Sequence, residues 1–310
     1  MRTQQVTRPL DYPIYQYVRE FLQYLDGERH YSAHTIQAYA TDLHQLLAYF
    51  KETQVNELQA VTRETLRTFM EFLLDRGMTI TSVVRKIAAV RSFFKYCAKK
   101  NIIDGNPAAI LLVPKVPKQL PHYLDEGTTV KVLEAPDGAT AQGKRDRAIL
   151  ELFYSTGIRL GELVQLNAGD IDFYNSSVKV LGKGSKQRVI PIGKQAIDAL
   201  KTSLATRAMG GRMSAEHLKQ PLFISNRGTR LSREMITVLV RKYIDAAAES
   251  EKKSPHLFRH TFATHLLDRG ADLVAVKELL GHESLSTTQV YTHVSTEQLK
   301  KVYRQSHPKA

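Results

Sequence analysis

The sequence predicts a mainly α-helical protein with a small β-sheet, built as two domains. Apolar residues recur at helical spacing along most of the 310 residues, whereas the short stretch 171–191 favours strands. Four prolines fall close together between Pro107 and Pro121, which excludes a helix or a central strand and favours a linker. At roughly 150 residues per domain, the length also suits two domains.

The first third of the chain is expected to form four helices. Ser32 is placed to cap the second helix, and Thr62 opens the third, which Gly77 would end. The expected ranges are 12–26, 33–50, 63–76 and 81–100.

The fourth of these helices has two distinct faces. One is apolar and is formed by Val83, Ile87, Val90, Phe94 and Cys97. Another is basic and is formed by Arg85, Arg91, Lys95 and Lys99. A solvated helix face usually mixes charges of both signs, but residues 76–120 hold nine basic side chains and one acid, Asp104. This imbalance favours contact with nucleic-acid phosphates over a merely solvated face.

The proline-rich stretch divides the chain into a helical DNA-binding domain over 1–110, a linker over 111–122 and a second domain over 123–310. In the second domain, residues 171–191 read as strands around a turn at "GKGSK", and one or two short helices close the chain. The other helices are expected at 125–135, 144–156, 194–208, 232–248, 255–268 and 272–280.

Composition points to a polyanionic partner. Lys and Arg total 44 against 31 acidic residues, a formal charge of +13, which favours nucleic acid first and an anionic membrane surface second. The N-terminal stretch lacks the apolar core of a signal peptide and no run of 18 apolar residues occurs, so no membrane partner is expected.

Cys97 is the single cysteine, which excludes an internal disulfide and fits a cytoplasmic location.

Several common kinds of site are excluded or disfavoured. The chain has no phosphate-binding G-x-x-x-x-G-K-[ST] loop, no G-x-G-x-x-G and no H-E-x-x-H. The acidic pair in "DID" at 170–172 suggests a two-metal nuclease, although such carboxylates at the start of a hairpin are more often solvated. His260 and His265 lack a carboxylate or cysteine at a useful spacing, which disfavours a metal site.

Cationic side chains are better candidates for chemistry. In "SPHLFRHTFATHLLDRG", Ser254 and Pro255 would begin a helix whose first turn carries His256, and Arg259 follows on the same face. Free N–H groups and the helix dipole favour an anion there, so the pair forms a possible phosphate cradle; the alternative is a capped helix with two incidental basic residues. Phe258 belongs to a separate, apolar stripe.

Two further cations are weak signals when each is taken alone. Arg159 in "STGIRLGELVQL" follows a glycine at the start of a short apolar helix. Lys183 lies between two glycines at the expected hairpin tip, where most lysines are only solvated.

The stretch "LGHESLSTTQVYTHV" at 280–294 adds a candidate nucleophile. Gly281 would end a helix immediately before His282, and Ser286 with Gln289 fits a capping box for the next helix. Tyr291 would lie in the second turn of that helix. A tyrosine has a pKa near 10 and becomes a useful nucleophile only where cations stabilise the phenolate.

Together and in this order, Arg159, Lys183, His256, Arg259, His282 and Tyr291 resemble the catalytic set of the tyrosine recombinase, or phage integrase, family. The segments "TGIRLGEL", "GKGSKQR", "HLFRHTFATHLLDRGADL" and "LLGHESLSTTQVYTHV" are similar to those of Xer-type chromosome-dimer resolvases, and the resemblance extends over essentially the whole chain. Phe258 stands where many members have leucine, which changes packing rather than chemistry.

The resemblance implies a two-domain, C-shaped clamp around duplex DNA. It assigns Tyr291 as the nucleophile that forms a 3′-phosphotyrosyl bond. Arg159 and Arg259 would bind the non-bridging phosphate oxygens and Lys183 would protonate the leaving 5′-oxygen. His256 and His282 would assist with hydrogen bonds and proton transfer. No metal ion, ATP or other cofactor is expected.

The partners implied by the resemblance are a duplex DNA recombination site, a tetrameric synapse with the same chain or a paralogue, and a septal DNA translocase. The apolar patch Leu299, Val302 and Tyr303 either packs on its own domain or docks on the next subunit, and the resemblance favours the second. A DNA-binding protein of this fold without cleavage, and the metal-dependent nuclease, are the alternatives.

Overall fold

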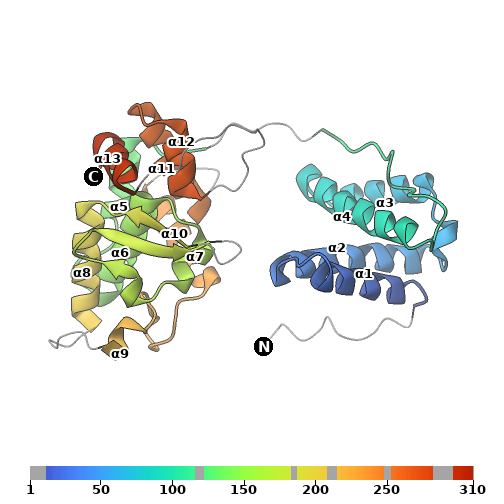
Figure 1. Ribbon diagram of the computed structural model, residues 1–310, viewed down its shortest axis with the longest axis horizontal. Coiled ribbons are helices and arrows are strands. Elements are labelled where there is room, and N and C mark those ends of the chain that lie inside the picture. Colours follow the sequence, from blue (N-terminus) through green and yellow to red (C-terminus); the bar gives the residue numbers. More distant parts are fainter. Residues whose placement is uncertain are drawn as a thin grey trace. The chain divides into compact units, whose positions relative to one another are not determined.

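A computed structural model describes residues 12–115, 122–182, 187–207, 215–247, 253–281 and 296–309 (Figure 1). The chain forms two compact units, Met1–Gln119 and Leu120–Ala310, which we call the N-terminal and the C-terminal unit. Helices dominate both, and the named strands of the described residues form one three-stranded sheet. The expected mainly helical fold with a small sheet is therefore confirmed. No helix in the described ranges has the length and apolarity needed to cross a membrane.

The N-terminal unit contains the four expected helices, each within a few residues of its predicted range. They are α1 (Tyr15–Gly27), α2 (Ala33–Glu52), α3 (Arg63–Asp75) and α4 (Ile80–Lys99), with an unexpected 3₁₀ turn at Leu58–Ala60. The Ser32 and Thr62 side chains accept backbone N–H groups three residues on, as their capping roles require, and Gly77 adopts a φ of +76° after α3.

The apolar face of α4 forms part of the core of this unit. Its five expected members, Val83, Ile87, Val90, Phe94 and Cys97, are all fully buried. Aromatic contacts reinforce this core, for example the edge-on pairing of Phe21 with Phe93 at 5.7 Å between ring centroids.

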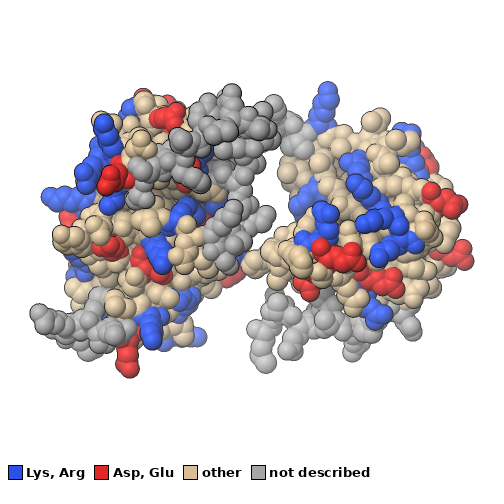
Figure 2. Space-filling model, viewed as in Figure 1, with Lys and Arg blue, Asp and Glu red and all other residues tan. Residues whose placement is uncertain are grey.

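The basic residues of α4 have different environments. Lys95 and Lys99 are exposed, and Figure 2 shows Lys and Arg side chains gathered on one face of this unit. The exposed Arg85 pairs with the buried carboxylate of Asp42. Arg91 is half-buried and donates to the carbonyls of Ala108 at 3.0 Å and Leu111 at 2.9 Å. Arg91 therefore holds the chain that follows α4, a structural task that its helical position alone did not indicate.

The C-terminal unit contains every expected helix whose range is described, together with some that were not expected. Its helices are α5 (Glu126–Glu134), α6 (Ala141–Thr156), α7 (Leu160–Gln165), α8 (Lys194–Arg207), α9 (Ala215–Leu218), α10 (Arg233–Ala247), α11 (Pro255–Asp268), α12 (Leu273–Leu280) and α13 (Thr296–Ser306). The prediction for α6 began too late, because Thr140 caps the helix through Gly143 N. The short α9 and the 3₁₀ turn Ala168–Asp170 were missed.

The sheet is antiparallel, in the order β1 (Ile171–Asp172), β2 (Ser177–Leu181), β3 (Gln187–Pro191). Val178 pairs with both Ile171 and Ile190, which brings apolar side chains to the face that meets the helices. The expected strands are thus confirmed, although residues 183–186 of the predicted turn lie outside the described ranges.

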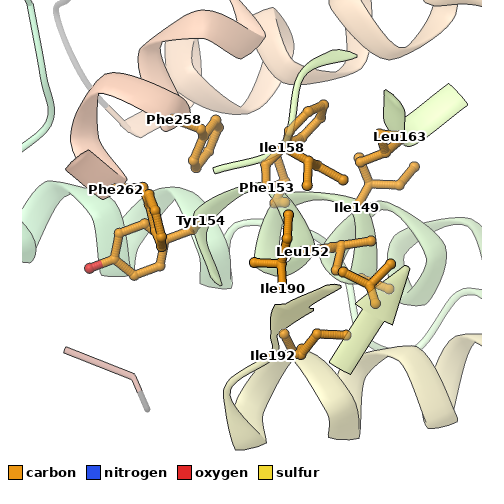
Figure 3. Close-up of a cluster of buried hydrophobic side chains, with 14 of the residues drawn as sticks. Ile149, Leu152, Phe153, Tyr154, Ile158, Leu163, Ile190, Ile192, Phe258 and Phe262 are labelled. Carbon is orange, nitrogen blue, oxygen red and sulfur yellow. The ribbon is translucent and has the colours of Figure 1, made fainter. Parts of the chain in front are cut away.

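Helix α6 lies at the centre of the unit, in contact with α5, α8, α11 and β3. It is buried on all sides from Ala148 to Thr156, as expected for a helix enclosed by other elements. Figure 3 shows Phe153 of α6 facing Phe258 of α11; the two rings stack at 6.3 Å between centroids. This placement makes Phe258 a core residue.

The C-terminal helix α13 packs on its own unit. Leu299 and Tyr303 are buried, and the Tyr303 hydroxyl lies 2.7 Å from the Ser155 hydroxyl of α6. His307 stacks on Tyr303 at 4.7 Å between ring centroids. In this structure the apolar patch therefore takes the first of the two alternatives, packing on its own domain.

His307 should make the stability of the C-terminal unit depend on pH. Its Nε2 lies 3.2 Å from the Tyr154 carbonyl and its Nδ1 accepts from Lys309 N, an arrangement that fits the neutral ring. Burial lowers the pKa of His307 to about 3, against about 6.5 in an unfolded chain. Between these values the unfolded chain binds the extra proton, so stability should fall as the pH drops below about 6.5.

The measurement is the thermal unfolding midpoint between pH 5 and 8. Replacement of His307 by Gln should reduce the pH dependence, and the same change at His34, exposed on α2, is the control. An unchanged pH dependence in the His307→Gln variant would mean that another group is responsible; burial also lowers the pKa of His265.

Candidate active site

The structure describes three of the six candidate catalytic residues, Arg159, His256 and Arg259. Lys183, His282 and Tyr291 lie outside the described residues. Arg159 and Arg259 meet in the C-terminal unit, beside the end of α12, although 100 positions separate them in the chain (259 − 159 = 100).

Arg159 is positioned by the sharp turn that ends α6. Gly157 has a φ of +59°, and a Cβ there would approach Phe262 Cδ1 to 2.5 Å, so the position requires glycine. The chain then turns into α7 with Arg159 as its N-cap residue, as expected. Glu162, in the first turn, accepts from Arg159 N at 2.8 Å and from Arg159 Nη1 at 3.0 Å.

Arg259 is positioned by α11, which begins where the sequence predicted. Ser254 is the N-cap residue and Pro255 follows it, but the Ser254 side chain makes no capping hydrogen bond. His256 is exposed in the first turn, whereas Arg259 is only 8% exposed. Arg259 donates to the Gly157 carbonyl and to the Leu280 carbonyl, each at 2.7 Å, and so joins the ends of α6 and α12.

Three arginines converge on the last carbonyl groups of α12. The Leu279 carbonyl accepts from Arg188 Nε at 3.3 Å, the Leu280 carbonyl from Arg259, and the Gly281 carbonyl from Arg159 Nη2 at 2.9 Å. Such carbonyls have no partner within the helix, and the negative end of the helix dipole attracts cations. Gly281 itself ends α12 with a φ of +65°, as predicted. The arginines therefore fix the residue that immediately precedes His282.

A buried carboxylate holds two of these arginines together. Glu162 is 7% exposed, and both of its oxygens accept from Arg188, each at 2.8 Å. Burial alone would raise the pKa of Glu162, but the hydrogen bonds from Arg188 and from the Arg159 backbone outweigh it and the pKa is lowered. The carboxylate is therefore charged at neutral pH.

The cluster of Arg159, Arg188, Arg259 and Glu162 carries a formal charge of +2 (three cations, one anion). Burial and the nearby Arg159 lower the pKa of Arg259 to about 10. The lowered pKa reflects first the cost of burying a cation and second its repulsion by neighbouring cations, and an anion bound beside Arg259 would reduce both. Arginine forks suit the paired oxygens of a phosphate.

Sequence reasoning missed Glu162 and Arg188. Glu162 was detectable, because an acid three residues after a helix start fits a capping arrangement. Arg188 gave no such local signal, since its partners Glu162 and Leu279 are 26 and 91 positions away.

The described residues do not support the metal-dependent alternative. They contain no group of three or more His, Cys, Asp or Glu side chains that could hold a metal ion. Asp170 caps Asn167 N, and Asp172 accepts from the backbone of Tyr174 and Asn175. The acidic pair at 170–172 therefore organises local turns.

The family of the chain follows from its similarity to known proteins. Residues 122–298 match the phage integrase family, and residues 18–101 match the phage integrase N-terminal SAM-like domain. Tyrosine recombinase XerC of Pelotomaculum thermopropionicum is 41% identical over 305 residues, which cover 96% of this chain and 99% of that protein. Tyrosine recombinase XerD of Staphylococcus haemolyticus is 37% identical over 293 residues, which cover 94% and 99%.

Solved structures agree with this assignment. The XerH site-specific recombinase bound to difH substrate in a pre-cleavage complex matches with a TM-score of 0.66 at 25% identity, covering 92% of this chain and 83% of that one. A lambda integrase dimer bound to a COC′ core site matches with a TM-score of 0.68 over 91% and 99% of the two chains; at 17% identity it supports the fold alone. This chain therefore belongs to the phage integrase family and is a tyrosine recombinase, an enzyme that cleaves and rejoins DNA.

Proposed function

We propose that the chain is a site-specific recombinase that resolves chromosome dimers at cell division, with Tyr291 as its nucleophile. The observation that carries the catalytic part of this proposal is the convergence of Arg159, Arg188 and Arg259 on the end of α12. This cationic cluster lies at the point from which the chain continues into the segment that contains His282 and Tyr291. Relatives named XerC and XerD support the chromosomal role.

In the proposed reaction, the Tyr291 hydroxyl gives up its proton as its oxygen attacks the scissile phosphorus and forms a 3′-phosphotyrosyl ester. The bond between phosphorus and the 5′-oxygen breaks, and Lys183 gives a proton to that oxygen. His256 and His282 donate hydrogen bonds and move protons. Because the ester retains the energy of the broken phosphodiester, a 5′-hydroxyl can attack it and rejoin the strands without ATP or a metal ion.

Arg159 and Arg259 would lower the activation barrier of strand cleavage electrostatically. Negative charge on the non-bridging oxygens is met by Arg159 and Arg259, whose guanidinium groups are already held by backbone carbonyls. Preorganised cations in a poorly solvated site need little rearrangement as charge develops, so they stabilise the transition state more than mobile side chains would.

The proposal extends to the DNA and the protein partners. Residues 1–110 and 123–310 would bind opposite sides of a duplex recombination site as a clamp, joined by the linker 111–122. Four protomers would form the synapse, with the same chain or a paralogue. Relatives that match almost their whole length carry both the XerC and the XerD name, which is compatible with either arrangement. A septal DNA translocase is the further partner proposed.

The test is formation of a covalent protein–DNA adduct in EDTA. A target duplex is first selected from random DNA by binding, and a nicked version is then incubated with the chain. An adduct in EDTA supports the proposed covalent, metal-independent cleavage. Binding without an adduct on any selected duplex would identify a DNA-binding protein, and cleavage that needs added metal would identify a nuclease.

The exposed lysines of α4 should contribute to DNA binding through phosphates. Replacing both Lys95 and Lys99 by alanine should weaken binding to all duplexes and reduce the slope of log affinity against log salt by about 0.9 for each phosphate that the protein no longer neutralises. The same change at Lys51 and Arg63, exposed on α2 and α3, serves as the matched control. An equal weakening in both pairs would show a general charge effect and no specific basic face. Arg91 is unsuitable for this test because it also holds backbone carbonyls.

A further inference from the structure

Arg188 of β3 belongs to none of the proposed catalytic roles, yet it contacts the framework of the site on two sides. It binds both oxygens of Glu162 and also the carbonyl of Leu279. We propose that Arg188 is a positioning residue for strand cleavage: it occupies Glu162 so that Arg159 stays available to the phosphate, and it ties β3 to the end of α12. The inference rests on the proposed role of Arg159.

The first part of this role follows from how the Glu162 carboxylate is shared. Arg188 takes both oxygens at 2.8 Å, whereas Arg159 Nη1 reaches one of them at 3.0 Å. Arg159 is thereby left to direct Nη2 to the Gly281 carbonyl, and its side chain is 38% exposed against 17% for Arg188. Without Arg188, Arg159 would be the described arginine that still donates hydrogen bonds to the buried Glu162 carboxylate. The carboxylate would then draw both Nη atoms of Arg159 inward.

The second part concerns the segments that Arg188 joins. Strand β3 begins at Gln187, directly after residues 183–186, and α12 ends at Leu280, followed by Gly281 and then His282. The guanidinium lies against Gly281, where an added Cβ would come within 3.0 Å of Arg188 Cζ. A glycine is thus needed at 281 both for its φ of +65° and for the close approach of Arg188. Arg188 therefore connects the strand that follows Lys183 to the helix that precedes His282.

Arg188 is suited to positioning rather than to binding substrate. Its Nε and both of its Nη atoms donate to protein acceptors, and its side chain is less exposed than that of Arg159, which keeps Nη2 on the Gly281 carbonyl at the rim of the cluster. Misplacement of reacting groups by even about 1 Å can cost roughly 100-fold in rate, so removal of these hydrogen bonds should act on the chemical step.

The test compares Arg188→Lys with Arg145→Lys in the full chain. Arg145 is a matched control: it also binds a buried carboxylate, Asp146, and a backbone carbonyl, that of Ile224, and its side chain is 14% exposed. Lysine keeps the charge but cannot span two oxygens and a carbonyl. Both variants should lose similar thermal stability. Only Arg188→Lys should slow single-turnover adduct formation, by at least about tenfold, with duplex affinity unchanged.

A double variant tests the sharing of Glu162. Arg188→Gln should be slower than Arg188→Lys, and adding Glu162→Gln should restore part of the rate because the carboxylate no longer competes for Arg159. The proposal is overturned by a normal cleavage rate in Arg188→Lys, by equal slowing in Arg145→Lys, or by a double variant no faster than Arg188→Gln. If the unmodified chain forms no adduct, the proposed function fails instead, which is a separate outcome.

Discussion

Replacement of Tyr291 by phenylalanine should abolish the covalent protein–DNA adduct while leaving duplex binding intact. The change removes one hydroxyl oxygen, the proposed nucleophile, and keeps the aromatic ring. A neutral tyrosine hydroxyl is a weak nucleophile, and in the proposed mechanism the other five candidate residues serve Tyr291 and have no chemistry to perform without it. Adduct formation on a nicked duplex in EDTA is the measurement.

The control is Tyr174→Phe, because Tyr174 is 95% exposed on the surface of the same unit. This variant should form the adduct at the normal rate. An adduct that persists in Tyr291→Phe would exclude Tyr291 as the nucleophile and would direct attention to another hydroxyl of the chain.

Replacement of Arg259 by lysine should lower the rate of adduct formation by roughly 100- to 1,000-fold, the range seen when one preorganised donor is removed from a charged transition state. Lysine keeps a positive charge, but it cannot hold the Gly157 and Leu280 carbonyls together, so the charge would no longer be fixed at the proposed position of the phosphate. Single-turnover rates and thermal midpoints are measured together.

Arg207→Lys provides a control with a similar structural cost. Arg207 also donates to two backbone carbonyls of the C-terminal unit, those of Pro221 and Leu222. Both variants should have a lower thermal midpoint. Only Arg259→Lys should also have a lower rate of adduct formation once the rate is corrected for the fraction of folded protein. If Arg259→Lys lowers the thermal midpoint and leaves the rate unchanged, Arg259 is a structural residue only.

Much of the fold was predictable because its signals are local. The caps at Ser32 and Thr62 act on N–H groups three residues away, and Gly281 ends α12 through its own backbone conformation. The apolar stripe of α4 is likewise visible at i, i+4 and i+7. The start of α6 was misplaced by the prediction, because a cap at Thr140 followed by polar residues carries little apolar periodicity.

The candidate site divides in the same way. Arg159 and Arg259 were identifiable, because each lies near the start of a helix and together they match a known family pattern. The structural role of Arg91 could not be identified from the sequence. The carbonyls that accept its hydrogen bonds, those of Ala108 and Leu111, belong to an irregular segment with no periodicity. Nor could periodicity decide whether Leu299 and Tyr303 pack on their own unit.

By itself, the sequence determined the class of fold, the order of the helices and the set of chemical groups, since these depend on neighbours within a few residues. Only the tertiary structure decided that Glu162 and Arg188 belong to the cluster and that three arginines fix the end of α12. Those interactions join residues 26, 91 and 102 positions apart, for example Arg259 with Gly157. They form because folding buries charges that must then find partners, and which partners are within reach is a property of the packed chain.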